Sequence, residues 1–108
     1  MNKIVKNRLE EIRKLCREYD VKSLYVFGSG ASGNFKDKSD IDLLVSFKKI
    51  PIKKYTDNYF SLHYLFQKLF NREIDLITEN SLSNPYFIES IEKTKLLLYE
   101  SGNKKISD

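Results

Sequence analysis

Two aspartates one residue apart, Asp40 and Asp42, follow a Gly-Ser pair, Gly28 and Ser29, after a short loop of small and polar residues. Alternate residues of a strand project to the same face, so we expect both carboxylates to lie together near the start of a strand. Two unpaired carboxylates side by side repel each other, and a divalent cation resolves this conflict. Hard oxygen ligands suit Mg²⁺, which binds one or two carboxylates together with substrate phosphates. The spacing therefore predicts a Mg²⁺ site at Asp40 and Asp42.

The Gly-Ser pair suits a phosphate-binding corner. Gly28 has no Cβ, so its backbone can approach a phosphate closely. Ser29 adds a hydroxyl donor, and the N–H groups that follow it can hold phosphate oxygens, especially where a helix begins. Neither a lone Gly-Ser nor a lone pair of aspartates is specific. Together, at this spacing and between two apolar runs, they predict phosphoryl-transfer chemistry.

A third carboxylate, Asp75, stands within the apolar segment EIDLIT. If the strand that carries Asp75 lies beside the strand that carries Asp42, the three carboxylates share one face. Such a group could hold two ions, which would stabilise the attacking and leaving oxygens of an in-line displacement. The third carboxylate could also accept the proton of the attacking hydroxyl. We therefore name Asp40, Asp42 and Asp75 as the candidate catalytic and metal-binding residues.

The elements that must position these residues follow from hydrophobic periodicity. Apolar residues at three- and four-residue steps predict helices, and short apolar runs predict strands. A small mixed sheet flanked by helices, an α/β (α+β) domain, accounts for this order. The predicted helices cover residues 2–20, 55–70 and 85–93, and the predicted strands cover residues 23–27, 41–47, 73–78 and 95–99, with a loop at 28–38.

The composition limits the class of protein. The 108 residues fit one domain, which we place at residues 1–100 with a polar tail at 101–108. No apolar run approaches the length of about 20 residues needed to cross a bilayer, and the N-terminal segment has no apolar signal core. The single cysteine, Cys16, fits a reducing cytoplasm. The net charge of +4 permits a polyanionic partner, but it is scattered, and we do not expect direct binding to nucleic acid.

Three further side chains have more than one interpretation. His63, the single histidine, sits beside the apolar stripe of the second helix, and we interpret it as a partly exposed structural residue rather than a general base. Phe60 and Tyr64 lie off that stripe. They could form a docking patch for a partner or widen the core contact, and the sequence does not decide between these.

At these residues the chain resembles a known family. The segments VFGSGASGNFKDKSDIDLLV, EIDLIT and NPYFIESIEKTKLLLYE are similar to those of minimal nucleotidyltransferases of the DNA polymerase β-like superfamily, close to the antitoxins of HEPN–MNT toxin–antitoxin systems. The resemblance implies a nucleotidyltransferase fold and Mg²⁺-dependent transfer of AMP from ATP to a hydroxyl. It implies that Gly28 and Ser29 bind the nucleotide and that Asp40, Asp42 and Asp75 bind metal. It also implies that the acceptor is a tyrosine of a HEPN ribonuclease toxin encoded by a neighbouring gene.

One departure from the family pattern keeps an alternative open. Many relatives carry an arginine in the loop after Gly-Ser, and Ser32 stands at that position here. A bidentate clamp on phosphate is then lost, which Lys36 or Lys38 could replace only as point charges. The alternative is a binding-only antitoxin that occludes the toxin with a vestigial site. A third hypothesis, a small aminoglycoside-type nucleotidyltransferase, is disfavoured by the length. No room remains for a separate acceptor-binding domain, so we expect a partner or an oligomer to complete the site.

Overall fold

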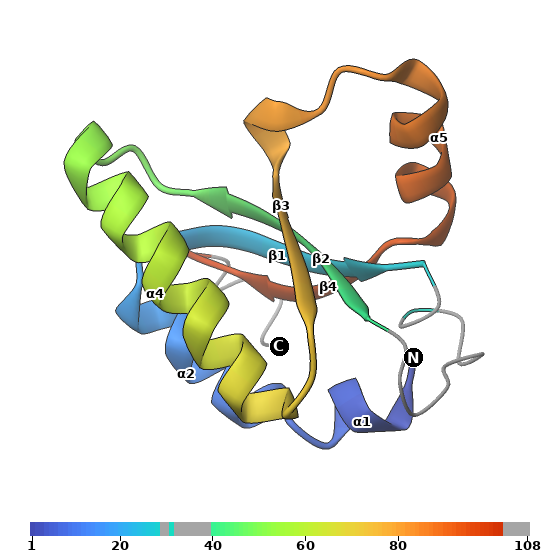
Figure 1. The fold of residues 1–108 in the computed structure, drawn as a ribbon, viewed down its shortest axis with the longest axis horizontal. Helices are drawn as coiled ribbons and strands as arrows, with labels where there is room; N and C mark the ends of the chain where they lie inside the picture. Colours follow the sequence, from blue (N-terminus) through green and yellow to red (C-terminus); the bar gives the residue numbers. More distant parts are fainter. Residues whose placement is uncertain (29–30, 32–39, 103–108) are drawn as a thin grey trace.

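A four-stranded sheet with helices on both faces forms the framework of the molecule (Figure 1). The structure, a computed structural model, describes residues 1–28, 31 and 40–102. Its elements in chain order are α1 (Lys3–Lys6), α2 (Leu9–Glu18), β1 (Val21–Phe27), β2 (Ile41–Phe47), α4 (Ile52–Phe70), β3 (Ile74–Thr78), the 3₁₀ turn η1 (Glu79–Ser81), α5 (Pro85–Thr94) and β4 (Leu96–Glu100).

The sheet has the strand order β3-β2-β1-β4. β1 pairs with both β2 and β4 in the antiparallel sense, whereas β2 and β3 are parallel. The parallel pair requires a crossover, and α4 supplies it between β2 and β3. The predicted α/β class and the small mixed sheet are therefore confirmed, and β3 lies at an edge of the sheet.

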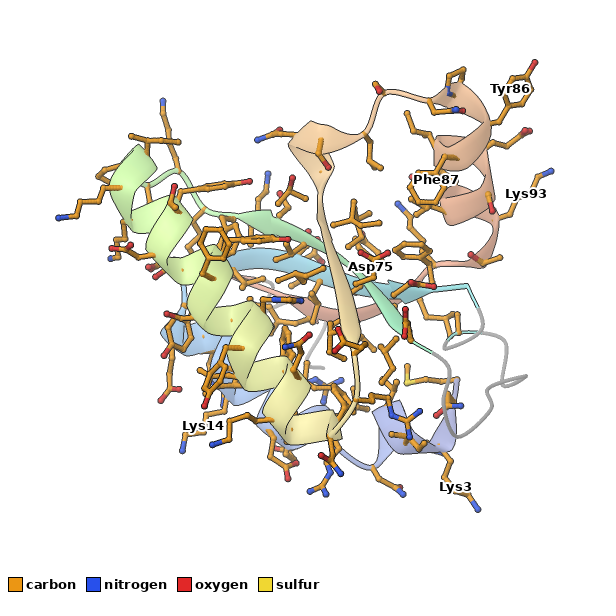
Figure 2. All side chains as sticks on the ribbon, in the orientation of Figure 1. Lys3, Lys14, Asp75, Tyr86, Phe87 and Lys93 are labelled. Carbon is orange, nitrogen blue, oxygen red and sulfur yellow. The ribbon has the colours of Figure 1, made fainter. Side chains whose placement is uncertain are left out.

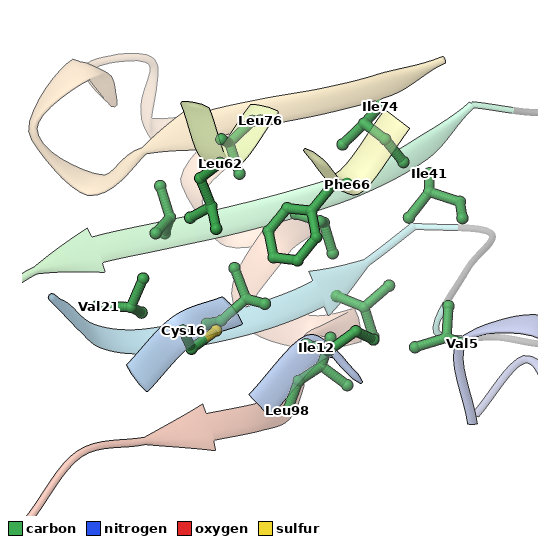
Figure 3. Packing of buried hydrophobic residues seen from close by; sticks show 14 of the residues in the cluster. Val5, Ile12, Cys16, Val21, Ile41, Leu62, Phe66, Ile74, Leu76 and Leu98 are labelled. Atoms are coloured by element: carbon green, nitrogen blue, oxygen red, sulfur yellow. The ribbon is translucent and has the colours of Figure 1, made fainter. Parts of the chain in front are cut away.

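The main hydrophobic core lies between the sheet and the helices α1, α2 and α4. Alternate residues of β2, such as Ile41, Leu43 and Val45, point into it and are buried. From the helices, Ile12 and Cys16 of α2 and Leu62 and Phe66 of α4 meet them, as the predicted stripes require (Figure 3). Burial of this kind is the main stabilising contribution to folding, and it fixes the strands that carry the candidate residues.

The opposite face of the sheet is covered less completely. Phe27, Leu44 and Ile91 form a smaller buried cluster there, so α5 packs over the end of β1 and the middle of β2. By strand alternation Asp42 shares this face with Leu44, and Asp75 shares it with Ile77. The candidate carboxylates thus lie on the α5 side of the sheet.

The single N-terminal helix predicted for residues 2–20 is wrong in one respect, because the chain forms two helices. α1 ends at Lys6 with Asn7 as its C-cap, and Arg8 leaves the helical conformation before α2 begins. Asn2 caps α1 by accepting a hydrogen bond from the Ile4 N–H at 2.7 Å. Asparagine favours caps and turns over helix interiors, which explains why the helix breaks near Asn7 although the apolar stripe continues.

The starts of β1 and α4 differ from the predictions by a few residues. β1 begins at Val21, directly after Asp20, whose φ of +59° turns the chain sharply out of α2. α4 begins at Ile52, because Pro51 can precede a helix but not continue inside one. Pro85 occupies the first turn of α5, as predicted, and Asn84 caps that helix. Within the described part of the chain, no helix is long and apolar enough to cross a membrane.

Candidate active site

The strand register brings Asp42 and Asp75 side by side. In the parallel pair Asp42 is the partner of Asp75, and in the antiparallel pair it is the partner of Phe27, the last residue of β1. The strand that carries Asp75 therefore lies beside the strand that carries Asp42, as the prediction for Asp75 requires. Figure 2 labels Asp75 beside β3, in the region between β3 and α5. Asp40 directly precedes β2 and is exposed, as is Asp75, whereas Asp42 is half-buried.

Gly28 lies against the carboxylate of Asp42. Its φ is +67°, a conformation that side chains rarely adopt, and a Cβ built on it would stand 2.9 Å from Asp42 Oδ2. The backbone conformation therefore favours glycine, and a Cβ there would displace the Asp42 carboxylate. The predicted approach of Gly28 to a phosphate stays a prediction.

α5 supports this corner through a contact that no pattern in the sequence indicates. The Gly28 N–H donates a hydrogen bond to Thr94 Oγ1 at 3.3 Å, and the Thr94 hydroxyl donates to the Ser90 carbonyl at 3.1 Å. Nearby, the rings of Phe27 and Phe87 meet edge to face with centroids 6.0 Å apart. Thr94 thus links the end of α5 to the turn after β1, although a threonine at a helix end carries no sequence signal for such a contact.

The surroundings of Asp42 disfavour the ionised form of its carboxyl group. Burial, followed by the charges of Asp75 and Asp40, raises the pKa of Asp42 from 3.8 to about 6. Each of these causes disfavours the ionised form of the carboxyl group. A bound cation would reverse the effect of all three, because it favours ionised oxygen ligands.

The donor set suits a hard divalent cation such as Mg²⁺. Asp40, Asp42 and Asp75 offer only carboxylate oxygens, with no sulfur or imidazole among them. Among the residues that the structure describes, no three acidic, histidine or cysteine side chains are gathered into a ready-made metal cage. This is compatible with a site that Mg²⁺ shares with substrate phosphates, since Mg²⁺ takes only one or two protein carboxylates in such sites.

Several predicted residues lie outside the described part of the chain. These are Ser29, the proposed phosphate ligand, Ser32, which replaces the family arginine, and the two lysines that could substitute for it, Lys36 and Lys38. The polar tail beyond Gly102 also lies outside it. These interpretations remain predictions from the sequence.

His63 and the aromatic residues of α4 have distinct environments. His63 is half-buried, and its Nε2 lies 2.8 Å from the carbonyl oxygen of Ile74, which fits the structural interpretation. Phe60 and Tyr64 are 64% and 58% exposed, so they do not extend the core. The core interpretation is therefore wrong, and the docking patch stays a prediction.

A cavity of about 500 Å³ opens on the α5 side of the sheet. Residues from the start of β1 and the end of β2, including Lys22, Ser23 and Ser46, line it together with Glu92 and Lys95. Gly28 and Asp42 occupy the opposite ends of these two strands. The cavity therefore lies apart from the corner where the candidate carboxylates meet.

Comparison with known proteins places the chain among nucleotidyltransferases. The family model "Polymerase beta, Nucleotidyltransferase" matches residues 10–104. Putative protein adenylyltransferase MJ1379 of Methanocaldococcus jannaschii is 36% identical over 90 residues, which cover 82% of this chain and 89% of that protein. Protein adenylyltransferase MntA of Thermococcus cleftensis is 32% identical over 73 residues, covering 67% and 70%.

The fold also matches solved structures. A structure of tri-AMPylated Shewanella oneidensis HEPN toxin in complex with MNT antitoxin contains a chain that superposes with a TM-score of 0.62. That match covers 94% of this chain and 77% of the other, at 17% identity. At this identity the likeness shows the fold alone, and the function must be argued from the site and from the closer relatives.

Proposed function

The chain belongs to the polymerase beta nucleotidyltransferase family of enzymes, and on this premise we propose that it transfers AMP from ATP to a hydroxyl group of a protein. The observation that carries the proposal is the pairing of Asp42 with Asp75 on adjacent strands, beside a glycine whose Cβ would meet Asp42. The names of the relatives as protein adenylyltransferases support the choice of AMP and of a protein acceptor.

In the proposed reaction an oxygen of the acceptor hydroxyl forms a bond to the α-phosphorus of ATP. The bond from that phosphorus to the bridging oxygen breaks, and pyrophosphate leaves with the electron pair. Asp75 accepts the hydroxyl proton, and Gly28 lets the backbone approach the phosphates. Asp40, Asp42 and Asp75 would hold Mg²⁺, which would supply charge neutralisation for the phosphates. Ser29 would bind a phosphate oxygen, as the family resemblance implies.

We propose that the acceptor is a tyrosine of a HEPN ribonuclease toxin and that the chain acts as its antitoxin. Support comes from the MntA relative and from the fold shared with a chain in the complex of an AMPylated HEPN toxin with MNT antitoxin. A hydroxyl must reach Asp42 and Asp75 from solvent, and the exposure of Asp40 and Asp75 leaves that approach open. The partner would supply the acceptor hydroxyl.

A second candidate, a binding-only antitoxin, is favoured by Ser32, which stands where many relatives carry a phosphate-binding arginine. The two candidates differ in what they require of the carboxylates. Chemistry needs Asp40 and Asp42, whereas occlusion needs only the surface that contacts the toxin.

The double variant Asp40→Asn and Asp42→Asn tests the proposal in cells that express the toxin. Catalysis predicts that growth is no longer rescued although the variant still co-purifies with the toxin. Rescue equal to that of the unaltered chain would instead establish occlusion. Asp57→Asn, on the exposed side of α4, is the matched control, because it removes one carboxylate charge away from the site.

A further inference from the structure

β3 is an edge strand whose outer side faces α4. Because β3 ends the strand order, β2 is its single neighbour among the strands that the structure describes. The Ile41 N–H donates to the Glu73 carbonyl at 3.3 Å, so Glu73 directs its peptide groups toward β2. Peptide groups alternate in direction along a strand. The carbonyls of Ile74 and Leu76 therefore point outward, away from β2, one on each side of Asp75.

Two side chains of α4 bind these two outward carbonyls. The Tyr59 hydroxyl donates to the Leu76 carbonyl at 2.6 Å, and Nε2 of His63 lies 2.8 Å from the Ile74 carbonyl. Since a carbonyl can only accept, Nε2 of His63 carries the hydrogen. Burial, then the charge of Asp75, raises the pKa of Tyr59, which keeps its hydroxyl a donor. We call this pair of hydrogen bonds the Tyr59–His63 clamp.

The spacing of the clamp matches the two elements. Residues four apart rise about 6 Å along a helix, and residues two apart advance about 6.6 Å along a strand. α4 and β3 run in opposite senses, so Tyr59 reaches the later strand residue and His63 the earlier one. The two rings are nearly parallel, at 10° with centroids 6.3 Å apart, so they support each other's orientation.

The clamp restrains β3 at the position where the strand carries Asp75. Asp75 is the register partner of Asp42 on the neighbouring strand. An edge strand can relax away from its neighbour more easily than a central strand, because one side has no sheet partner. Hydrogen bonds at the residues on both sides of Asp75 restrain such a movement.

We propose that Tyr59 and His63 are positioning residues that hold Asp75 beside Asp42 by binding the backbone carbonyls on both sides of it. The inference rests on the proposed function, because it gives Asp75 a part in the transfer. Neither side chain needs to touch the substrate. Their effect passes through the strand to the carboxylate.

The test compares clamp variants with a control on the same helix. Tyr59→Phe removes only the hydroxyl, and His63→Leu removes the second donor. His63→Gln restores an N–H at a similar distance from the backbone. Asn58→Ala is the control, because Asn58 also donates hydrogen bonds from α4, at 2.9 Å to the Tyr19 carbonyl and at 3.0 Å to Asp20 Oδ2, but none to β3.

We expect the double variant Tyr59→Phe and His63→Leu to lower kcat about tenfold or more, the usual effect of removing outer partners of a metal or catalytic ligand, with little change in KM for ATP. Replacing leucine by glutamine at position 63 should recover part of that loss. Asn58→Ala should lower the melting temperature while kcat stays within about twofold of the unaltered chain. Equal kcat in the double variant and the Asn58→Ala control would overturn the inference.

A second measurement separates this inference from the proposed function. The amides of Asp75 and Ile77 face β2, so their hydrogen exchange measures how often β3 separates from β2. This measurement needs no transfer reaction. Faster exchange at these amides in the double variant, but not in Asn58→Ala, supports the clamp, and unchanged exchange overturns it. If the unaltered chain transfers no nucleotide, the proposed function fails, while the exchange result still decides whether the clamp holds the strand.

Discussion

Asp42 lies against the negative charges of two neighbouring aspartates, and this gives its titration a visible effect on stability. Its pKa is raised from 3.8 to about 6 by burial, Asp75 and Asp40. When a carboxyl has a higher pKa in the folded state, the unfolded chain releases the proton first. The contribution of Asp42 to the free energy of unfolding is therefore greatest at low pH, and it falls as the pH rises from about 4 to about 6.

The variant Asp42→Asn should remove this dependence. With a metal chelator present, we expect the variant to have the higher melting temperature above pH 6, because it no longer places a charge beside Asp75. The advantage should shrink as the pH falls toward 4, where Asp42 is protonated. Thermal unfolding followed by circular dichroism across this range measures the difference, with the exposed Asp57→Asn as the control. A difference that does not change with pH would show that Asp42 titrates normally.

Gly28 combines a left-handed backbone with contact to Asp42. Gly28→Ala should lower the free energy of unfolding by about 1–2 kcal/mol, the cost of a Cβ in that conformation. The Cβ would also displace the Asp42 carboxylate, and a displacement of about 1 Å at a reacting group can cost about 100-fold in rate.

Gly102 provides the matched control for Gly28. Its φ is +68°, yet a Cβ there would meet nothing within 4 Å. Gly102→Ala should therefore lose similar stability while its transfer rate is unchanged. If both variants kept full activity in a nucleotide-transfer assay, contact between Gly28 and Asp42 would have no part in the chemistry.

At the scale of elements, α5 supports the glycine corner through Thr94. Thr94→Val keeps the shape of the side chain but removes the acceptor of the Gly28 N–H. We expect a loss of about 1 kcal/mol in stability, the usual net value of one hydrogen bond, and a several-fold fall in transfer rate. Thr56→Val is the matched control, because the Thr56 hydroxyl also donates a hydrogen bond to the carbonyl four residues earlier, that of Ile52, at 3.1 Å. Thr56 does not contact the site. Equal rates in the two variants would contradict a role for α5 at this corner.

Some elements could be predicted from the sequence more accurately than others. β2 was predicted with its observed bounds, because its continuous apolar run and flanking polar residues leave little choice. The break between α1 and α2 was missed, because the apolar stripe runs through it and only the local preferences of asparagine oppose it. Asp42 and Asp75 could be named from their strands, but their adjacency depends on strand order, which is a long-range property.

The contacts that the sequence could not indicate are those between distant segments. Thr94 meets Gly28 across 66 residues, and Asn58 reaches the turn at Tyr19 and Asp20 across 39 and 38 residues. Tyr59 was predicted as a core residue of its stripe, yet its hydroxyl also binds β3. Periodicity shows which face of a helix is buried, but it does not show which polar atoms that face brings to a partner.

At the scale of the whole molecule, the two faces of the sheet have different roles. α2 and α4 cover one face and form the main core, whereas α5 covers only part of the other. The carboxylates lie on the incompletely covered face, where Asp40 and Asp75 are exposed. This arrangement suits an enzyme whose acceptor is part of another protein, because a large partner can approach the site directly.

The most direct test of the account is the mass of the partner after reaction. The purified chain is incubated with Mg²⁺, ATP and a HEPN protein chosen as the candidate partner, and intact masses of both proteins are recorded. We expect the HEPN protein to gain mass in steps of one AMP, and we expect Asp42→Asn to abolish the gain. A stable complex with no mass gain, whichever nucleoside triphosphate is supplied, would contradict the proposed transfer and would favour a binding-only antitoxin.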